Sequence, residues 1–339
     1  MRESDIRPAD LLAEYLRLSA ADARRFFPDP EAFVARACPG CGAEQPVSAF
    51  VKTGFTFVRC GACDTLYAAT VPSDQDLGAF YADSPSQRYW AEVFFPAVAE
   101  ARREKIFRPR VERLRALTRE HGEAPSRIIG EAPSRIIDVG AGTGIFLEEC
   151  RALGFGRELR AVEPNGAMAR RLKEGGFTTC AGFATDAALA WGGWADLTVS
   201  FEVLEHTTSP LAFVTGLKAL TRPGGLILVS GLCGTGFDIM VLGERSNAVS
   251  PPHHLTFLSR AGVAALLRRA GLEEVAFLTP GQLDVDIVRS AALADPAAVA
   301  DPFLRRLVTG GDAERSAFQA LLAAHGLSSH MWLVARVSS

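Results

Sequence analysis

The chain lacks the features that mark several large classes of protein. Its 339 residues carry 36 lysines and arginines against 39 acidic residues, a net charge of −3, so it has no basic excess of the kind that favours nucleic acid. No apolar run reaches the length that spans a bilayer, and residues 1–10 contain no apolar signal-peptide core. Seven cysteines do not suit a secreted disulfide scaffold of this size. We therefore expect a cytoplasmic protein that binds neither nucleic acid nor membrane.

The patterns that are present divide the chain into four segments. Its composition, 48% hydrophobic and 22% charged, is that of a globular protein long enough for one large domain with appendages. Apolar residues at helical spacing predict helical segments over 1–36 and 72–134, on either side of a cysteine-containing segment over 37–71. Residues 135–339 alternate strands and helices, which is typical of a parallel sheet with crossover helices. The helix predicted at 100–120 is rich in charge, and we interpret its charges as a solvated face.

An eight-residue sequence, GEAPSRII, occurs twice in tandem, at 122–129 and at 130–137. A unit this short does not match the repeats of solenoid proteins. Only the second copy runs directly into Asp138, so we predict that it contains the first strand of the sheet. The first copy is expected to be a loop or linker, and it suggests no function.

Four cysteines have the spacing of a metal site. They follow the pattern C-x2-C-x18-C-x2-C, at Cys38, Cys41, Cys60 and Cys63. Two C-x-x-C pairs at this distance predict a tetrahedral zinc site, with two disulfides or free core thiols as the alternatives. Four thiolates leave no open position for a substrate, so the zinc would be structural. Only Lys52 and Arg59 are basic between the first and last of these cysteines, too few for a surface that follows a phosphate backbone.

A glycine-rich turn between a strand and a helix is the most informative motif. The sequence IIDVGAGTGIF at 136–146 places three glycines in five positions, where any Cβ would obstruct a ligand lying against the backbone. The spacing is G-x-G-x-G, whereas dinucleotide sites have G-x-G-x-x-G. An acid, Asp138, precedes the turn, and Glu163 ends the next predicted strand. A carboxylate at that position can accept hydrogen bonds from both hydroxyls of a ribose, a device that NAD enzymes also use.

Hydrophobic runs and turn residues give the remaining elements of the sheet. Strands are predicted at 135–139, 158–163, 178–181, 196–201, 226–230, 274–279 and 331–337. Helices are predicted to begin near Gly144, Gly166, Asp186, Pro210 and Ser259.

Four segments in register resemble class I S-adenosylmethionine (SAM) methyltransferases: VGAGTG, VEPN, FEVLEH and LTRPGGLILVS. The resemblance implies an α/β fold, a seven-stranded Rossmann-like sheet whose last strand is antiparallel to the others. An N-terminal helical and zinc-ribbon region would precede this sheet, and a helical insertion at about 283–325 would precede its last strand.

The same resemblance implies SAM as the cofactor and assigns its contacts. Asp138, Gly140, Gly142 and Gly144 would surround the methionine part. Glu163 would hold the ribose, with Pro164 beside the adenine and with Gly182 and Phe183 flanking it. Phe201 and Glu202, at the end of the fourth strand, would line the cofactor near its sulfonium.

Histidines supply the candidate catalytic groups. His253 and His254 lie in PPHHLTFLS, within a lid loop at about 232–258 that follows the fifth strand, and His206 follows the fourth strand. We predict that His254, with His253 or His206, deprotonates or orients the methyl acceptor. The loop and the cysteine module together resemble bacterial methyltransferases of sugar and secondary-metabolite pathways. The sugar C-methyltransferases of that group carry YHEHL where this chain has PPHHL, so methylation of oxygen is at least as well supported as methylation of carbon.

The sequence therefore predicts a SAM-dependent methyltransferase with a structural Zn²⁺ that acts on a small molecule, such as a sugar, a nucleotide sugar or a natural-product intermediate. One alternative is an RNA or protein methyltransferase that docks its substrate through the zinc ribbon. Another is a SAM-binding protein without catalytic activity. The oligomeric state stays open, with a homodimer as one option.

Overall fold

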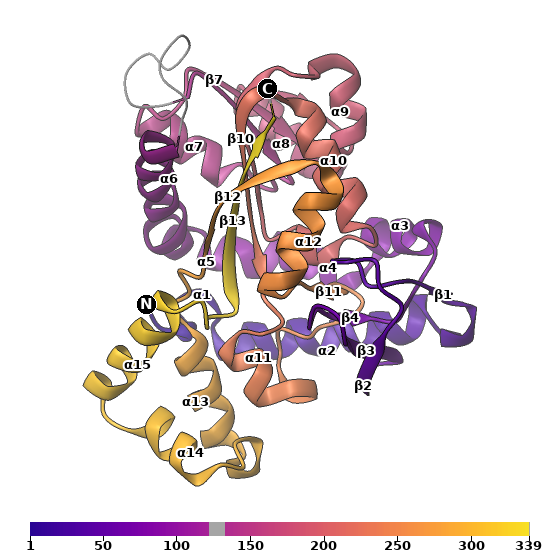
Figure 1. Cartoon of the computed structure of the whole chain (residues 1–339), viewed down its shortest axis with the longest axis vertical. Helices are drawn as coiled ribbons and strands as arrows, with labels where there is room; N and C mark the ends of the chain where they lie inside the picture. The colour runs from indigo at the N-terminus through magenta and orange to yellow at the C-terminus, as the bar shows by residue number, and fades with distance from the viewer. Residues whose placement is uncertain (122–132, 339) are drawn as a thin grey trace.

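A seven-stranded sheet forms the centre of the protein (Figure 1). The computed structural model describes residues 1–121 and 133–338. The strand order is β12-β13-β10-β9-β6-β7-β8, and β13 runs antiparallel to both of its neighbours. The strands are β6 (Arg135–Val139), β7 (Glu158–Val162), β8 (Thr178–Cys180), β9 (Ala195–Phe201), β10 (Thr221–Leu232), β12 (Leu272–Leu278) and β13 (His330–Val337). All seven predicted strands are confirmed, and β6 has the predicted bounds. The first copy of the duplicated sequence lies outside the described residues.

Helices cover both faces of this sheet because its strands are apolar on both sides. One face packs against helices that bury small and branched side chains, for example Ala187, Leu217 and Leu266. These helices are α9 (Ala184–Trp191), α10 (Pro210–Leu220) and α12 (Arg260–Ala270). The other face packs against helices that bury Leu114, Phe146 and Leu172. They are α6 (Arg108–His121), α7 (Ile145–Ala152) and α8 (Gly166–Glu174).

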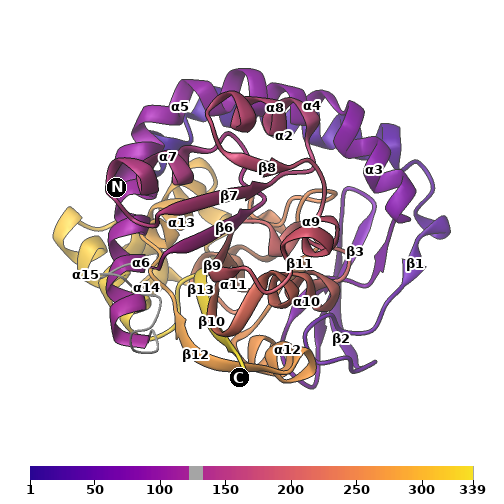
Figure 2. The same cartoon turned by 90° about the horizontal axis from the view of Figure 1, so that it is seen from above.

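The N-terminal region is helical, as predicted, and runs along one side of the sheet (Figure 2). Its elements are α1 (Glu3–Ile6), α2 (Ala9–Phe26), η1 (Pro30–Ala32), α3 (Asp74–Asp83), α4 (Pro85–Tyr89), α5 (Phe95–Arg102) and two π-helical turns, η2 (Trp90–Phe94) and η3 (Arg103–Phe107). Aromatic rings join these helices to one another. Tyr15 of α2 lies 5.1 Å from Trp90 and 6.2 Å from Phe94, measured between ring centroids.

The cysteine segment forms a second, four-stranded sheet that includes a strand from the distant lid loop. The order is β11-β4-β3-β2, and a separate pair joins β1 to β5. The strands are β1 (Val34–Ala35), β2 (Pro46–Lys52), β3 (Phe55–Cys60), β4 (Leu66–Ala68), β5 (Thr70–Val71) and β11 (Thr256–Phe257). Strand β11 pairs antiparallel with β4, with Thr256 opposite Tyr67. The predicted segment boundaries stay a prediction, but this sheet joins the segment at 37–71 to the one at 135–339.

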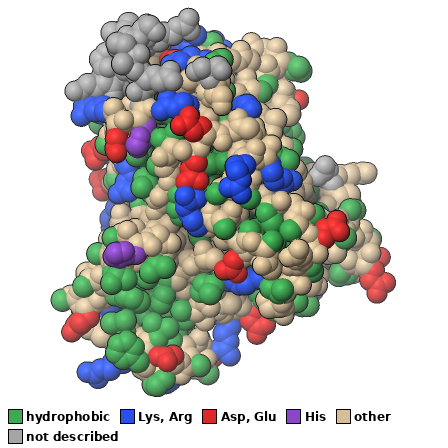
Figure 3. Space-filling view, in the orientation of Figure 1, with side chains coloured by type: hydrophobic (Ala, Val, Ile, Leu, Met, Phe, Trp, Pro, Cys, Tyr) green, Lys and Arg blue, Asp and Glu red, His purple; other side chains and the backbone are tan. Residues whose placement is uncertain are grey.

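Two helical segments follow β10 and β12. The lid loop contains α11 (Phe237–Leu242) and η5 (Gly243–Arg245), and the predicted insertion contains α13 (Asp284–Ala294), η6 (Pro296–Ala298), α14 (Pro302–Thr309) and α15 (Asp312–Ala324). Figure 3 shows hydrophobic side chains gathered over this insertion, where Leu293 and Phe303 are 60% and 74% exposed. Among the described residues, no helix is both long and apolar enough to cross a membrane.

Candidate active site and cysteine cluster

The glycine turn lies between the end of β6 and the start of α7, at the carboxyl edge of the sheet. Gly140, Gly142 and Gly144 have φ angles of 77°, 55° and 86°, which side chains other than glycine rarely adopt. A Cβ on Gly140 would meet Val203 at 2.5 Å, whereas a Cβ on Gly142 would meet nothing within 4 Å. The Gly142 backbone therefore faces open space, as expected of a turn against which a ligand lies.

Glu163 closes this turn from the neighbouring strand. Its two carboxylate oxygens accept hydrogen bonds from the backbone N–H of Gly142 at 2.8 Å and of Asn165 at 2.9 Å. Burial raises the pKa of Glu163, and these two N–H groups oppose that rise. Each oxygen keeps a second lone pair, so the carboxylate can still accept hydrogen bonds from a diol.

Asp138 is buried beneath the turn with an unsatisfied oxygen. Its side chain is 2% exposed, and Oδ1 has no hydrogen-bond partner among the described residues. Burial first, and the Glu163 carboxylate second, raise the pKa of Asp138 to about 8. A buried acceptor without a donor costs free energy, and the ammonium group of a bound amino acid would remove that cost. The turn, Asp138 and Glu163 thus fit the methionine and ribose parts of SAM.

The residues predicted to flank the adenine follow β7 and β8. Pro164 is exposed beside Glu163, and Gly182 follows Cys180 at the end of β8. Phe183 is 67% exposed, an unusual state for a phenylalanine and one that a stacked base would relieve. These positions lie on the same edge of the sheet as the glycine turn.

Glu202 follows β9 in a left-handed backbone conformation, with φ of 56°. Its Oε1 accepts hydrogen bonds from Ser230 Oγ at 2.5 Å and from Arg110 Nη2 at 3.1 Å. Burial alone would raise the pKa of Glu202, but His330, Arg110 and Ser230 outweigh it and lower the pKa. An ionised carboxylate therefore stands beside Phe201, where the sulfonium is expected.

Arg110 is an exception to the solvated face predicted for the charges at 100–120, most of which are exposed. It belongs to the helix whose charges were expected to face solvent, yet it is 9% exposed. Its guanidinium lies 4.7 Å from the centroid of the Phe201 ring and pairs with Glu202. No local pattern distinguishes it from the other arginines of α6, because its burial depends on where the sheet edge lies.

His330 of β13 is a second residue of this site that the sequence did not predict, and its Nε2 lies 3.5 Å from Glu202 Oε1.

His206 and His254 lie together at the same edge. Their ring centroids are 4.8 Å apart in an edge-to-face arrangement. His254 Nδ1 lies 2.6 Å from the carbonyl oxygen of Ala248. Burial lowers the pKa of both imidazoles below the ordinary value of 6.5, and for His206 the neighbouring His254 lowers it further. Both rings are therefore neutral at pH 7.

His253 points away from this pair, into the wall made by the N-terminal helices. It is 1% exposed, with Nδ1 3.0 Å from Gln87 Nε2 and Nε2 3.4 Å from Ser86 Oγ. Its ring lies 4.9 Å from that of Phe80. Both ring nitrogens are used within the protein, so the geometry favours a structural role for His253, and its predicted catalytic role finds no support in these contacts.

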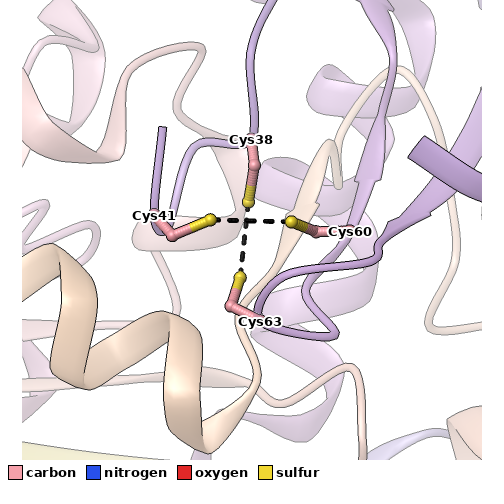
Figure 4. Close-up of side chains that lie close together, drawn as sticks. All are labelled: Cys38, Cys41, Cys60 and Cys63. Carbon is pink, nitrogen blue, oxygen red and sulfur yellow. Dashed lines mark hydrogen bonds between the residues drawn. The ribbon is translucent and has the colours of Figure 1, made fainter. Parts of the chain in front are cut away.

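The four cysteines come together as the spacing predicts (Figure 4). Cys38 Sγ and Cys63 Sγ are 3.5 Å apart, as are Cys41 Sγ and Cys60 Sγ, and all four sulfurs lie within 4.8 Å of one another. A disulfide needs about 2.05 Å, whereas zinc–sulfur bonds of about 2.3 Å in a tetrahedron separate the sulfurs by about 3.8 Å. The cluster can hold zinc, and its geometry disagrees with the disulfide alternative.

The cysteine module holds the loop that carries His254. Besides the β4–β11 pair, Arg36 donates from its guanidinium to the carbonyl oxygens of Leu255 at 2.7 Å and Thr208 at 2.8 Å. The Ser259 hydroxyl donates to the carbonyl oxygen of Cys63. Ahead of His254, Lys52 of β2 donates to the carbonyl oxygen of Ser246 at 2.7 Å. Residues on both sides of His254 are thus bonded to the module, so the position of this histidine depends on it.

A comparison with protein families agrees with this geometry. A family model described as a methyltransferase domain matches residues 100–276, more than half of the chain. The chain belongs to this methyltransferase family. Together with the strand order and the antiparallel β13, the match makes it a class I SAM-dependent methyltransferase.

Similar curated proteins are ubiquinone biosynthesis O-methyltransferases. That of Xanthomonas axonopodis pv. citri is 31% identical over 147 residues, 40% of this chain and 62% of the relative. That of Dinoroseobacter shibae is 32% identical over 150 residues, 41% of this chain and 60% of the relative. The matched part of this chain spans about three-fifths of the length of these relatives.

Solved structures resemble the fold at low identity. A SAM-dependent methyltransferase from Archaeoglobus fulgidus is 16% identical, with a TM-score of 0.42 over 69% of this chain and 97% of that chain. A geranyl diphosphate methyltransferase in complex with SAM is also 16% identical, with a TM-score of 0.43 over 72% of this chain and 91% of that chain.

Proposed function

We propose that this methyltransferase transfers the methyl group of SAM to a hydroxyl oxygen of a small molecule. The observation that carries the proposal is the neutral pair His206 and His254 beside Glu202, at the edge where the glycine turn, Asp138 and Glu163 fit SAM. A neutral imidazole can accept the proton of a hydroxyl group, and one of this pair belongs to the lid loop. The similarity to O-methyltransferases supports oxygen over carbon as the acceptor atom.

Each residue has a defined part in this proposal. Glu163 and Asp138 bind the ribose and the methionine ammonium, and the turn lets the cofactor lie against the Gly142 backbone. SAM supplies an activated methyl group, so the protein needs only to orient the acceptor and to manage its proton. His254 takes that proton through its ring, and Glu202 places negative charge near the sulfonium. As the new O–CH₃ bond forms, the S–CH₃ bond breaks and its electron pair stays on sulfur.

We also propose that Zn²⁺ occupies the four-cysteine cluster in a structural role. The set of four thiols and their near-tetrahedral spacing support this. Docking of RNA on this module finds no support. Lys52, one of its two basic residues, donates to the Ser246 carbonyl at 2.7 Å, and Arg59 donates to the Gly234 carbonyl at 2.9 Å.

The test combines binding with transfer. Calorimetry with SAM on the zinc-loaded protein is expected to show one site per chain. Incubation with methyl-labelled SAM and a panel of sugars, nucleotide sugars and phenolic natural products is expected to label a hydroxyl oxygen of one class. Labelling of RNA or protein with no transfer to any small hydroxyl compound would contradict the proposal.

A further inference from the structure

A second set of side chains in the described part of the chain has the composition of a metal site. Glu205 and His206 belong to η4 (Leu204–His206), the short turn after β9, and His254 comes from the lid loop. One carboxylate oxygen and one nitrogen from each ring lie within 4.8 Å of one another. Neither the zinc proposal nor the proton-transfer role assigned above makes use of Glu205.

Glu205 carries an unsatisfied buried oxygen. The residue is 2% exposed, and Oε2 has no hydrogen-bond partner among the described residues. A Cβ on Gly231 would lie 2.9 Å from this oxygen, so β10 encloses it on one side without offering a donor. A buried carboxyl oxygen of this kind gains free energy from a cation at the adjacent imidazoles.

A backbone carbonyl fixes the orientation of the His254 ring. His254 Nδ1 lies at hydrogen-bond distance from the Ala248 carbonyl, which accepts and so places the proton on Nδ1. Nε2 of the same ring then presents a lone pair. Metal-binding histidines use this arrangement, in which a backbone carbonyl fixes the tautomer and the orientation of the ring.

We propose that Glu205, His206 and His254 bind one divalent transition-metal cation, distinct from the zinc of the four cysteines. Two imidazoles and a carboxylate form a set that leaves coordination positions open, whereas four thiolates do not. An oxygen donor of the methyl acceptor would take an open position. This inference rests on the proposed function, because it concerns the acceptor side of the same site.

Such a cation changes how the acceptor loses its proton. A hydroxyl bound to a divalent cation is more acidic, so it ionises near neutral pH and releases its proton to water. The resulting oxyanion then attacks the methyl carbon, with the same bonds made and broken as before. With the cation bound, the lone pair of His254 serves the metal and the proton goes to water, whereas without the cation His254 accepts the proton itself. The acceptors expected are those with two adjacent oxygens, such as catechols or sugar diols, because they can fill two open positions.

Cobalt tests the proposal on the full chain. The protein is loaded with one equivalent of zinc, which the four thiolates bind, and is then titrated with Co²⁺ by calorimetry and visible absorption. We expect one Co²⁺ per chain with d–d bands and without the thiolate charge-transfer bands of a cysteine site. Glu205→Gln and His254→Ala are each expected to weaken Co²⁺ binding by about 100-fold or more. His325→Ala, at an exposed histidine of the insertion, is the matched control and leaves binding unchanged.

SAM affinity, measured on each variant, separates folding defects from loss of metal. Unchanged SAM binding shows that a variant is folded, and His254→Ala, at a half-buried loop position, serves if Glu205→Gln does not fold. Zinc-loaded wild-type protein that binds SAM but takes up no Co²⁺ would overturn this inference and leave the proposed function standing. Equal Co²⁺ affinity in wild type and His254→Ala would overturn it as well. Absence of SAM binding would instead refute the proposed function, whatever the cobalt result.

Discussion

Replacing Asp138 by asparagine is expected to stabilise the ligand-free protein and to weaken its binding of SAM. The carboxyl group is buried, with one oxygen unpaired in the described part of the chain, and its pKa is raised from 3.8 to about 8, first by burial and then by Glu163. Folding therefore favours the neutral carboxyl. Its contribution to stability is fully present below pH 3.8 and is lost as the pH rises towards 8.

The magnitude follows from the interval between the two pKa values. Each pH unit within it corresponds to about 1.36 kcal/mol, so wild-type stability falls by roughly 3–4 kcal/mol between about pH 5 and about pH 8 through this one group. Asparagine does not titrate, and any cost of fitting its amide is the same at both pH values. The difference in unfolding free energy, variant minus wild type, is therefore expected to grow by roughly 3–4 kcal/mol over this range.

Urea denaturation at the two pH values, followed by circular dichroism, measures this difference, and calorimetry at the higher pH measures SAM affinity. We expect the variant to bind SAM more weakly by at least about tenfold, because a charged hydrogen bond contributes about 1.5–3 kcal/mol. A stability difference that does not change with pH would refute the assignment of a raised pKa. Unchanged SAM affinity would refute the position of Asp138 in the cofactor site.

Three further predictions concern other parts of the site. Gly142→Ala places a methyl group in the open space beside the turn and should reduce SAM affinity. The control is Gly193→Ala, where φ is 64° and a Cβ would also meet nothing within 4 Å; it should carry the same backbone cost of about 1–2 kcal/mol and leave SAM binding unchanged. Equal SAM affinities of the two variants by calorimetry would contradict this. His254→Ala should lower turnover by about 10²–10⁴-fold at unchanged SAM affinity. Because the pKa of His254 is below 6.5, wild-type activity should persist as the pH falls through 6.5 and should decline only at lower pH. A loss of activity that begins above pH 6.5 would count against this histidine as the base. Cys60→Ser should lower the melting temperature and the turnover, because it disrupts the module that holds β11. It should leave SAM affinity within about twofold, because the cofactor residues lie in the other sheet. A variant with full turnover would show that the module does not position the loop.

The sequence was sufficient to predict the strands of the seven-stranded sheet, because each is a hydrophobic run bounded by turn residues. Strand β6 illustrates this, since Ile136, Ile137 and Val139 lie between a polar start and the glycine turn. The four cysteines were equally predictable, because metal ligands at fixed spacing constrain the chain locally. Strand β11 was not predicted, because two residues carry no periodicity and its partner β4 lies far away in the sequence.

The residues that the sequence did not reveal depend on tertiary contacts. Arg110 lies in the same charged helix as exposed arginines such as Arg113, and only the packing of α6 against the sheet edge brings it to Phe201. His253 and His254 are adjacent, yet their rings contact different parts of the protein. Gln87 and Ser86 of α4 engage the first, and the Ala248 carbonyl orients the second. The identity of the nearer partner decides the role of each ring, and no pattern within the loop contains that information.

The central claim is that the glycine turn and Glu163 hold SAM at the carboxyl edge of the sheet. Calorimetry of SAM and of NAD, each against wild type and Glu163→Ala, tests it most directly. The account predicts that wild type binds SAM at one site and does not bind NAD, and that Glu163→Ala loses most of its SAM affinity. Binding of NAD in place of SAM, or SAM affinity that Glu163→Ala leaves unchanged, would contradict it.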